Sequence, residues 1–306
     1  MAPAASEATG RLLIGCGLVV AGGAVLSLGA FCVRLAGDMS PWAYIFWRSV
    51  ALVAVLGVLG AVRAERDPFR QVAELGPFGW AGAICITGAA ATFLTALAVS
   101  TLAEVFFLCS LAPLLAAVLA YPVLGERIGA ITLAAVALAL VGLFLVAGGA
   151  VPTGGSLTGK VLAIASAFCF AGYTLSTRGA LAKDLDGMLI AFGLLSLVVG
   201  VVGVVVTGAK LAPDPASVAL AALHGGLVLA AGLWLLGRGS RHVGAVTLTM
   251  LAQTETVLAP LWGFLFFRET PAAIALVGGC IILAAVVLQA VGQAAGEGGR
   301  TSRQTL

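Results

Sequence analysis

The sequence VGAVTLTMLAQTETVLAPLWGFLFF, residues Val243–Phe267, is an apolar run about as long as a membrane-spanning helix requires. Near its middle it carries the polar residues Gln253, Thr254, Glu255 and Thr256. An ionised carboxylate at that depth costs roughly 2.5 to 3.5 kcal/mol on membrane-insertion scales. We therefore expect Glu255 to face a protein-lined or wet interior. There it acts either as a functional group or as a protonated, hydrogen-bonded group that holds helices together.

The same pattern occurs 143 residues earlier in the chain. An apolar run over Thr101–Leu124 ends at Gly125-Glu126-Arg127 and is followed by a second apolar run, Ile128–Ala147. In the later copy the turn is Arg268-Glu269-Thr270-Pro271, and another apolar run follows it. A repeat of this length predicts two duplicated halves, with Glu126 and Glu269 as structural anchors at the turns.

The composition indicates a polytopic membrane protein. Hydrophobic residues make up 61% of the chain, charged residues only 9%, and the mean hydropathy is +1.14. The net charge of +3 comes from cations scattered singly between apolar runs, which does not indicate a nucleic-acid partner. The six cysteines lie in apolar runs without metal-ligand spacing, so we expect neither a metal nor a cofactor.

Hydropathy and turn residues predict an all-α integral membrane protein with ten transmembrane helices. The predicted spans are Leu12–Leu35, Trp42–Val62, Gly76–Val99, Thr101–Leu124, Ile128–Ala147, Leu157–Ala180, Gly187–Thr207, Ala216–Gly237, Val243–Phe267 and Pro271–Gln293. Five spans in each half is an odd number, so the second half must be inverted relative to the first. The predicted units are a tail over 1–11, a first repeat over 12–148, a second repeat over 157–293 and a tail over 294–306.

The distribution of Lys and Arg predicts the orientation. Eleven of them fall on the side that holds both termini and four on the other side, with Arg48 inside a span. Cytoplasmic loops carry the excess of positive charge, so both termini are expected in the cytoplasm. Inverted repeats of this kind place a binding site near the bilayer midplane and expose it to each side in turn.

Three short motifs carry a resemblance to a known family. Pro113 and Thr256 each precede a glutamate by 13 residues, the second span contains Trp47-Arg48, and the fourth begins with Ala103-Glu104-Val105. The chain resembles, over about residues 12–293, the EamA-type members of the drug/metabolite transporter superfamily. The last motif is similar to the YddG-type amino-acid exporters of that superfamily. Thr256 stands where many members have Pro, which moves any proline kink to Pro260.

The resemblance implies a secondary transporter of the inner (plasma) membrane, and not an enzyme. It implies export of amino acids, aromatic or neutral, or of similar small metabolites by alternating access. The expected partners are a small-molecule substrate and the lipid bilayer, and the sequence permits a monomer. The alternatives are efflux of cationic drugs, which would need Glu255, and a membrane-embedded enzyme, for which no clustered catalytic groups occur.

Helical spacing singles out a set of candidate substrate-binding residues. Polar and aromatic side chains share one face of the second span and one face of the sixth. Such stripes line cavities for amphipathic solutes, and they also serve in packing and at membrane interfaces. Together with the polar residues of the ninth span, the candidates are Tyr44, Trp47, Arg48, Tyr173, Thr177, Gln253 and Glu255.

Four charged or titratable residues carry alternative interpretations. Arg48 either binds a substrate carboxylate, snorkels to the outer surface or pairs with Asp38. Glu104 is a gate or, as we favour, a solvated helix start stabilised by the macrodipole. His224 is a proton relay or, as we favour, a buried histidine bonded to a neighbouring helix. Glu104, His224 and Glu255 are the candidates for gating or proton coupling.

Overall fold

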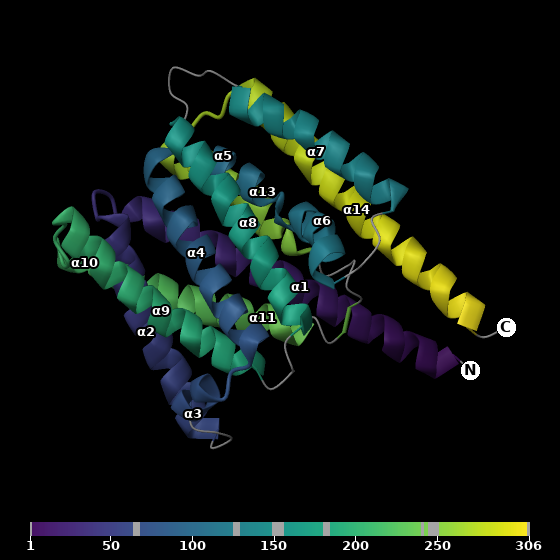
Figure 1. The fold of residues 1–306 in the computed structure, drawn as a ribbon, viewed down its shortest axis with the longest axis horizontal. Helices are drawn as coiled ribbons and strands as arrows, with labels where there is room; N and C mark the ends of the chain where they lie inside the picture. The colour runs from purple at the N-terminus through teal and green to yellow at the C-terminus, as the bar shows by residue number, and fades with distance from the viewer. Residues whose placement is uncertain are drawn as a thin grey trace.

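The structure is a computed structural model that describes residues 2–63, 68–124, 129–148, 156–179, 184–239, 242–243 and 251–304. Within these ranges the chain is entirely helical, with no strand (Figure 1). Its elements are α1 (Ala2–Leu35), α2 (Pro41–Arg63), α3 (Pro68–Ala73), α4 (Pro77–Val99), α5 (Leu102–Cys109), α6 (Ala112–Leu124), α7 (Ala130–Gly148), α8 (Leu157–Gly179), α9 (Asp184–Thr207), α10 (Pro215–Leu223), the π-helix η1 (His224–Leu229), α11 (Ala230–Gly239), α13 (Thr254–Phe267) and α14 (Ala273–Gln304).

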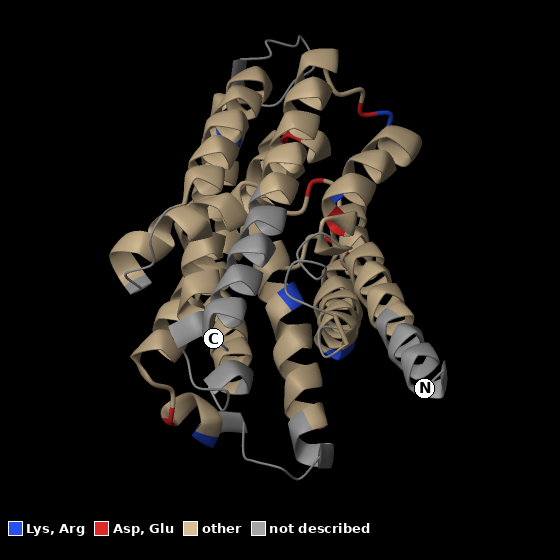
Figure 2. Cartoon of the chain, turned by 90° about the vertical axis from the view of Figure 1, so that its right-hand side faces the viewer, with Lys and Arg blue, Asp and Glu red and all other residues tan. Residues whose placement is uncertain are grey.

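Within the described ranges, seven helical segments are long and apolar enough to cross a membrane. They are Leu13–Leu35, Pro41–Leu59, Pro77–Val99, Leu102–Val123, Leu157–Thr177, Gly187–Thr207 and Pro215–Gly239. Three shorter apolar helices accompany them, Ala130–Val146, Thr254–Phe267 and Ala273–Leu288. Figure 2 shows how few charged residues interrupt these segments. A chain that hides its backbone hydrogen bonds inside helices in this way is suited to a lipid environment.

Local chemistry sets several helix ends. The Asp214 carboxylate accepts a hydrogen bond from the Ser217 amide (2.8 Å) and caps α10, whose first residue is a proline. Hydrogen bonds from Ser217 lower the pKa of this exposed carboxyl. Gly37 and Gly208, with φ of 59° and 66°, allow the chain to turn after α1 and α9.

Two of the predicted spans are interrupted. Thr101–Leu124 is divided into α5 and α6 by a turn at Ser110 and Leu111, and a turn at Gln253 precedes α13. Ser110 and Gln253 have nearly the same backbone angles, φ/ψ of −65°/−7° and −67°/−5°. They are also separated by the repeat length of 143 residues. Residues 244–250 of the ninth span, and the turn with Glu126, lie outside the described residues.

The helices α2 and α9, which form the second and seventh predicted spans, pack against each other in opposite directions. In the contact between α2 and α9, Gly203 lies against Trp42, Gly200 against Phe46 and Gly193 against Val53. The residue numbers therefore rise along one helix as they fall along the other.

The pair α7 and α14 follows the same rule. Gly142 lies against Gly278 and Ile282, while Gly278 lies against Leu145 and Val146. Both pairs approach through glycine, which lets the backbones come close, as is common between membrane helices.

Two further antiparallel contacts join the halves. The helix α1 packs on η1 and α11, and α4 packs on α8. The first contact brings Gly22 against Gly232 and Leu236, and the second brings Gly88 against Cys169. The ends of α1 and α14 that lead to the termini lie at the same end of the bundle (Figure 1). Large apolar side chains such as Phe144 and Val206, 78% and 79% exposed, cover the outside of the bundle.

We expect Gly225→Ala to destabilise the fold. A Cβ atom at this position of η1 would collide with the backbone carbonyl of Arg48 in α2, which can move only if α2 shifts. Overpacking of this kind costs about 1 to 3 kcal/mol. The melting temperature in detergent should fall by several degrees.

Gly57→Ala in α2 is the matched control. Nothing lies within 4 Å of a Cβ atom there, so this change should leave the melting temperature unchanged or raise it slightly. Equal melting temperatures for the two variants would contradict the close contact between η1 and α2.

Candidate functional site

Tyr44 of α2 and His224 of η1 form a buried hydrogen-bonded pair. The Tyr44 hydroxyl lies 2.9 Å from His224 Nδ1, and the two residues are only 2% and 5% exposed. The far side of the imidazole lies against α1, where a Cβ atom at Gly29 would come within 2.5 Å of Nε2. This geometry agrees with the expectation of a buried histidine bonded to a neighbouring helix, and proton relay stays a prediction.

Arg48 lies one turn beyond Tyr44 on α2 and is buried without a counter-ion. It is 4% exposed, and its guanidinium carbon lies 5.6 Å from the centroid of the Phe192 ring of α9, a cation–π contact. Among the described residues no acidic side chain forms an ion pair with it. The predicted pairing with Asp38 and the predicted snorkelling are therefore wrong, because α9 and η1 enclose this part of α2.

Unpartnered polar atoms gather along the contact between α2 and α9. Arg48 Nε and Nη2, Ser49 Oγ and Ser196 Oγ are buried without a hydrogen-bond partner. The one other such atom among the described side chains, Arg34 Nε, lies 2.7 Å from a carboxylate oxygen of Glu269. Buried polar groups are nearly always satisfied, so a cluster of exceptions calls for an explanation.

The π-helix η1 shapes this region. It begins at His224 and runs to Leu229 between α10 and α11. Such segments are rare and appear frequently at functional sites. Its first two residues make different contacts: the His224 ring lies within hydrogen-bond distance of Tyr44, while Gly225 packs on the Arg48 backbone. The site is thus built from α2 on one side and α9 and η1 on the other.

Glu255 lies in a second polar region, in the first turn of α13. It is half-buried, and the backbone there lies close to Gly23 of α1. Gln253 Oε1 accepts a hydrogen bond from the Thr256 hydroxyl (2.9 Å). Glu255 thus begins α13 directly after the turn at Gln253, beside α1.

The remaining predicted residues do not join the Arg48 cluster. Trp47 Nε1 donates to the carbonyl of Leu211 (2.8 Å), in the connection before α10. Tyr173 packs on Phe170, with ring centroids 5.6 Å apart, and the Thr177 hydroxyl donates to the Thr174 carbonyl within α8. The structure therefore brings together Tyr44, Arg48 and His224, and places the others apart from them.

Charged side chains from α1 and from the α13–α14 connection meet at the junction between α4 and α5. Arg34 donates from Nη1 to the carbonyl of Leu97 (2.6 Å) and from Nη2 to that of Ser100 (2.5 Å). Glu269, already paired with Arg34, accepts a hydrogen bond from the Leu102 amide (2.8 Å). These interactions thus join α1, the α4–α5 junction and the α13–α14 connection at one end of the bundle.

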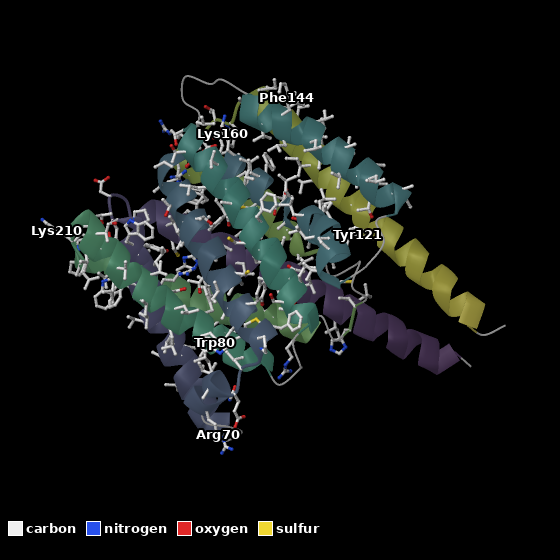
Figure 3. The ribbon with its side chains drawn as sticks, viewed as in Figure 1. Arg70, Trp80, Tyr121, Phe144, Lys160 and Lys210 are labelled. Atoms are coloured by element: carbon white, nitrogen blue, oxygen red, sulfur yellow. The ribbon has the colours of Figure 1, made fainter. Side chains whose placement is uncertain are left out.

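Glu104 extends this cluster to α8. Its carboxylate accepts a hydrogen bond from the Ser100 hydroxyl (2.7 Å) and lies 3.5 Å from Lys160 Nζ. Glu104 is 3% exposed, so the expectation of a solvated helix start is wrong: Lys160 and Ser100 replace water. Figure 3 places Lys160 at the end of α8 far from Arg70. We call Arg34, Ser100, Glu104, Lys160 and Glu269 the end network.

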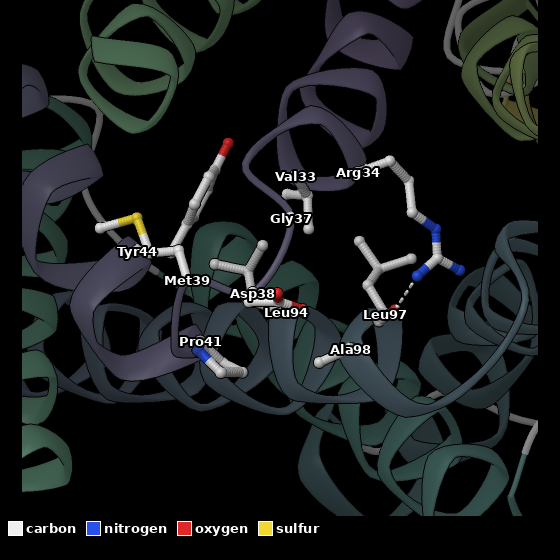
Figure 4. Close-up of a pocket in the computed structure, with 10 residues that line it drawn as sticks. All are labelled: Val33, Arg34, Gly37, Asp38, Met39, Pro41, Tyr44, Leu94, Leu97 and Ala98. Atoms are coloured by element: carbon white, nitrogen blue, oxygen red, sulfur yellow. Dashed lines mark hydrogen bonds between the residues drawn. The ribbon is translucent and has the colours of Figure 1, made fainter. Parts of the chain in front are cut away.

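A cavity of about 260 Å³ lies between the end network and Tyr44. Residues from the end of α1, the α1–α2 connection, the start of α2 and the end of α4 line it, including Arg34, Asp38, Tyr44 and Leu97 (Figure 4). Its volume lies just below the roughly 300 to 1,000 Å³ that ligand pockets usually have. The described residues contain no group of three or more His, Cys, Asp or Glu that could hold a metal ion.

The geometry adds residues that sequence reasoning missed. Phe192, Ser49 and Ser196 are ordinary residues of apolar helices, and nothing in the sequence marks them. Arg34 and Lys160 carried a signal, because each is a cation next to an apolar run on the side of the chain that has few cations. The sequence alone does not show with which glutamates these two cations form ion pairs.

Comparison with known proteins matches residues 13–148, and again residues 157–290, to the EamA-like transporter family. The chain belongs to the EamA-like transporter family. No curated protein matches this EamA-like transporter. A solved structure titled only as the crystal structure of a protein is similar to it, with a TM-score of 0.59. The identity is 19%, over 92% of this chain and 96% of the other, so this likeness shows the fold alone.

We expect Glu269→Gln to open the end network of this transporter. The change removes the counter-ion of Arg34, and a hydrogen bond to a charged group contributes about 1.5 to 3 kcal/mol. The readout is the reaction of Cys32, 4% exposed and two residues before Arg34, with a water-soluble maleimide. The measurement uses a background in which the other five cysteines are alanine. The rate of Cys32 modification should rise about tenfold, because it follows the population of molecules in which the end network is open.

Glu74→Gln serves as the control for this measurement. Glu74 forms an ion pair of similar length (2.8 Å) with Arg70, but both side chains are exposed and lie outside the end network. Its loss should leave the Cys32 rate unchanged. An unchanged rate in Glu269→Gln as well would show that the network does not hold this end closed.

Proposed function

We propose that this protein is a secondary transporter that exports amino acids, aromatic or neutral, or similar small metabolites across the plasma membrane by alternating access. The observation that carries the proposal is the buried cluster of Tyr44, Arg48 and His224. It joins helices from the two segments that match the family. A membrane transporter needs polar groups held away from lipid between its moving halves. Family membership favours a transporter over a membrane-embedded enzyme.

We further propose ten spans arranged as two inverted five-helix repeats. Counting α5–α6 and α10–η1–α11 as one span each, the chain has a helical segment at every predicted span, although part of the ninth is not described. The antiparallel pairs α2–α9 and α7–α14 support inversion, because each pair joins corresponding helices of the two halves. The matching turns at Ser110 and Gln253 support the repeat length. Broken helices in corresponding positions point to a transport site.

In this proposal both termini are cytoplasmic and the end network lies on the outer side. The support is the excess of Lys and Arg on the side of the termini. Arg34, Lys160 and Glu269 all belong to the opposite side. The end network then closes the outer entrance, and the cavity that reaches Tyr44 lies next to it, with Arg34 in both. Glu104, His224 and Glu255 stay candidates for gating or proton coupling.

Tyr44→Phe should lower transport about tenfold in counterflow assays on proteoliposomes with labelled amino acids. The change leaves His224 Nδ1 without its partner, and a buried group left unsatisfied costs about 1 to 3 kcal/mol. Tyr121→Phe is the control with the same chemical change, because Tyr121 is 57% exposed on α6 and should not affect transport (Figure 3). Wild-type vesicles that exchange no amino acid or related metabolite would overturn the proposed function.

A further inference from the structure

We propose that Arg48 binds the carboxylate of the transported solute, so that the substrates are anions or zwitterions and not cations. This inference rests on the proposed function and specifies the chemistry of its site. It starts from an arginine that is 4% exposed, with two buried guanidinium nitrogens that no described residue satisfies.

The depth of Arg48 makes an unpaired charge expensive. It lies seven residues after Pro41, about 10 Å along α2, within the apolar part of the span. A buried charge left without a partner is strongly destabilising, by several kcal/mol. The Phe192 ring provides only a part of the missing stabilisation, because a cation–π contact contributes about 0.5 to 2 kcal/mol. An anionic ligand would supply the remainder.

The two unpartnered nitrogens have the arrangement that a carboxylate requires. Nε and Nη2 lie on the same edge of the guanidinium plane, and their N–H bonds point in parallel. This edge binds both oxygens of a carboxylate through two parallel hydrogen bonds, which combine charge with geometry. A chloride ion or a neutral solute would use this edge less completely.

The neighbours of Arg48 leave the site positive. Tyr44 and His224 are bonded to each other, and Phe192 is apolar. No described carboxylate lies within ion-pair distance of the guanidinium. A cationic drug placed here would meet a fixed positive charge in a medium of low dielectric, where like charges repel strongly. The rival function of cation efflux is therefore disfavoured at this site.

The site has no duplicate in the other half. At the repeat offset of 143 residues, Arg48 corresponds to Ala191 and Tyr44 to Gly187. Ser49 and Ser196 lie along the same α2–α9 contact with unpartnered hydroxyls. A solute held by its carboxylate at Arg48 would thus bind in one orientation, with further hydrogen-bonding groups within the same helix pair.

The test compares solutes that differ only in the carboxylate. The probes are phenylalanine and leucine, their primary amides, phenethylamine and isopentylamine, with succinate as a dianion. Each competes in counterflow, and each is also measured for its effect on the melting temperature of the purified protein. In the wild type, the carboxylates should compete at least tenfold better than the matching amides, and the amines should compete least.

Arg48→Gln should abolish this discrimination. The KM of the carboxylate solutes should rise at least tenfold, while the weak competition by amides stays the same. Arg48→Lys should fall between the two, because an ammonium keeps the charge but not the paired N–H edge. Arg238→Gln is the matched control: Arg238 stacks on Trp234 with its guanidinium carbon 4.9 Å from the ring centroid, but it is exposed.

Each outcome decides the inference separately from the proposed function. If wild-type protein prefers amides or amines, or if folded Arg48→Gln keeps the preference for carboxylates, the inference is overturned while transport stands. If no solute exchanges but carboxylates alone raise the wild-type melting temperature, the inference stands and the proposed function fails. If Arg48→Gln does not fold, the wild-type comparison of acids, amides and amines decides alone.

Discussion

The close approach of α2 to the second half of the chain determines where the polar chemistry of this protein lies. Gly200 and Gly203 of α9 and Gly225 of η1 have no side chain where α2 passes, so the backbones nearly touch. That contact removes Arg48 from both lipid and water. Larger residues at these positions would separate the helices and let water reach the guanidinium. Glycine packing, which is usually discussed as a source of stability, here creates a buried positive charge.

The sequence predicted which segments form helices better than it predicted the helix turns and the side-chain contacts inside the bundle. Apolar runs and turn residues predicted helices close to those observed, because length and hydropathy govern insertion in a bilayer. The turns at Ser110 and Gln253 were not predicted: Pro113 follows the first turn at the second residue of α6, but no proline or glycine stands next to Gln253. Helical periodicity placed Tyr44 and Arg48 on one face, and that part of the candidate site is present.

Sequence reasoning failed where an outcome depended on a partner far along the chain. Arg48 was assigned to Asp38 as one alternative because the two are near in sequence, whereas the structure surrounds it with Phe192 and Gly225. Glu104 was expected in water because it begins a helix, yet Lys160, 56 residues later, lies beside it. Tyr173 and Thr177 share a face with cavity-lining chemistry, but Thr177 bonds within α8 and Tyr173 packs on Phe170 and on an apolar cluster that includes Ala83 and Met188. Contacts between residues this far apart in the chain cannot be recognised from the local sequence pattern.

The stretch from Leu97 to Leu102 forms hydrogen bonds with two distant parts of the chain at once. Arg34 holds its carbonyls and Glu269 holds its amide, and these two side chains also hold each other. Releasing any one of them leaves the others strained or unpaired, so separation has to proceed as a single cooperative event. Opening of this end therefore requires all of these interactions to be lost together. If this end closes the outer entrance, as we propose, such a barrier would keep small ions from leaking through partial openings and dissipating the gradients across the bilayer.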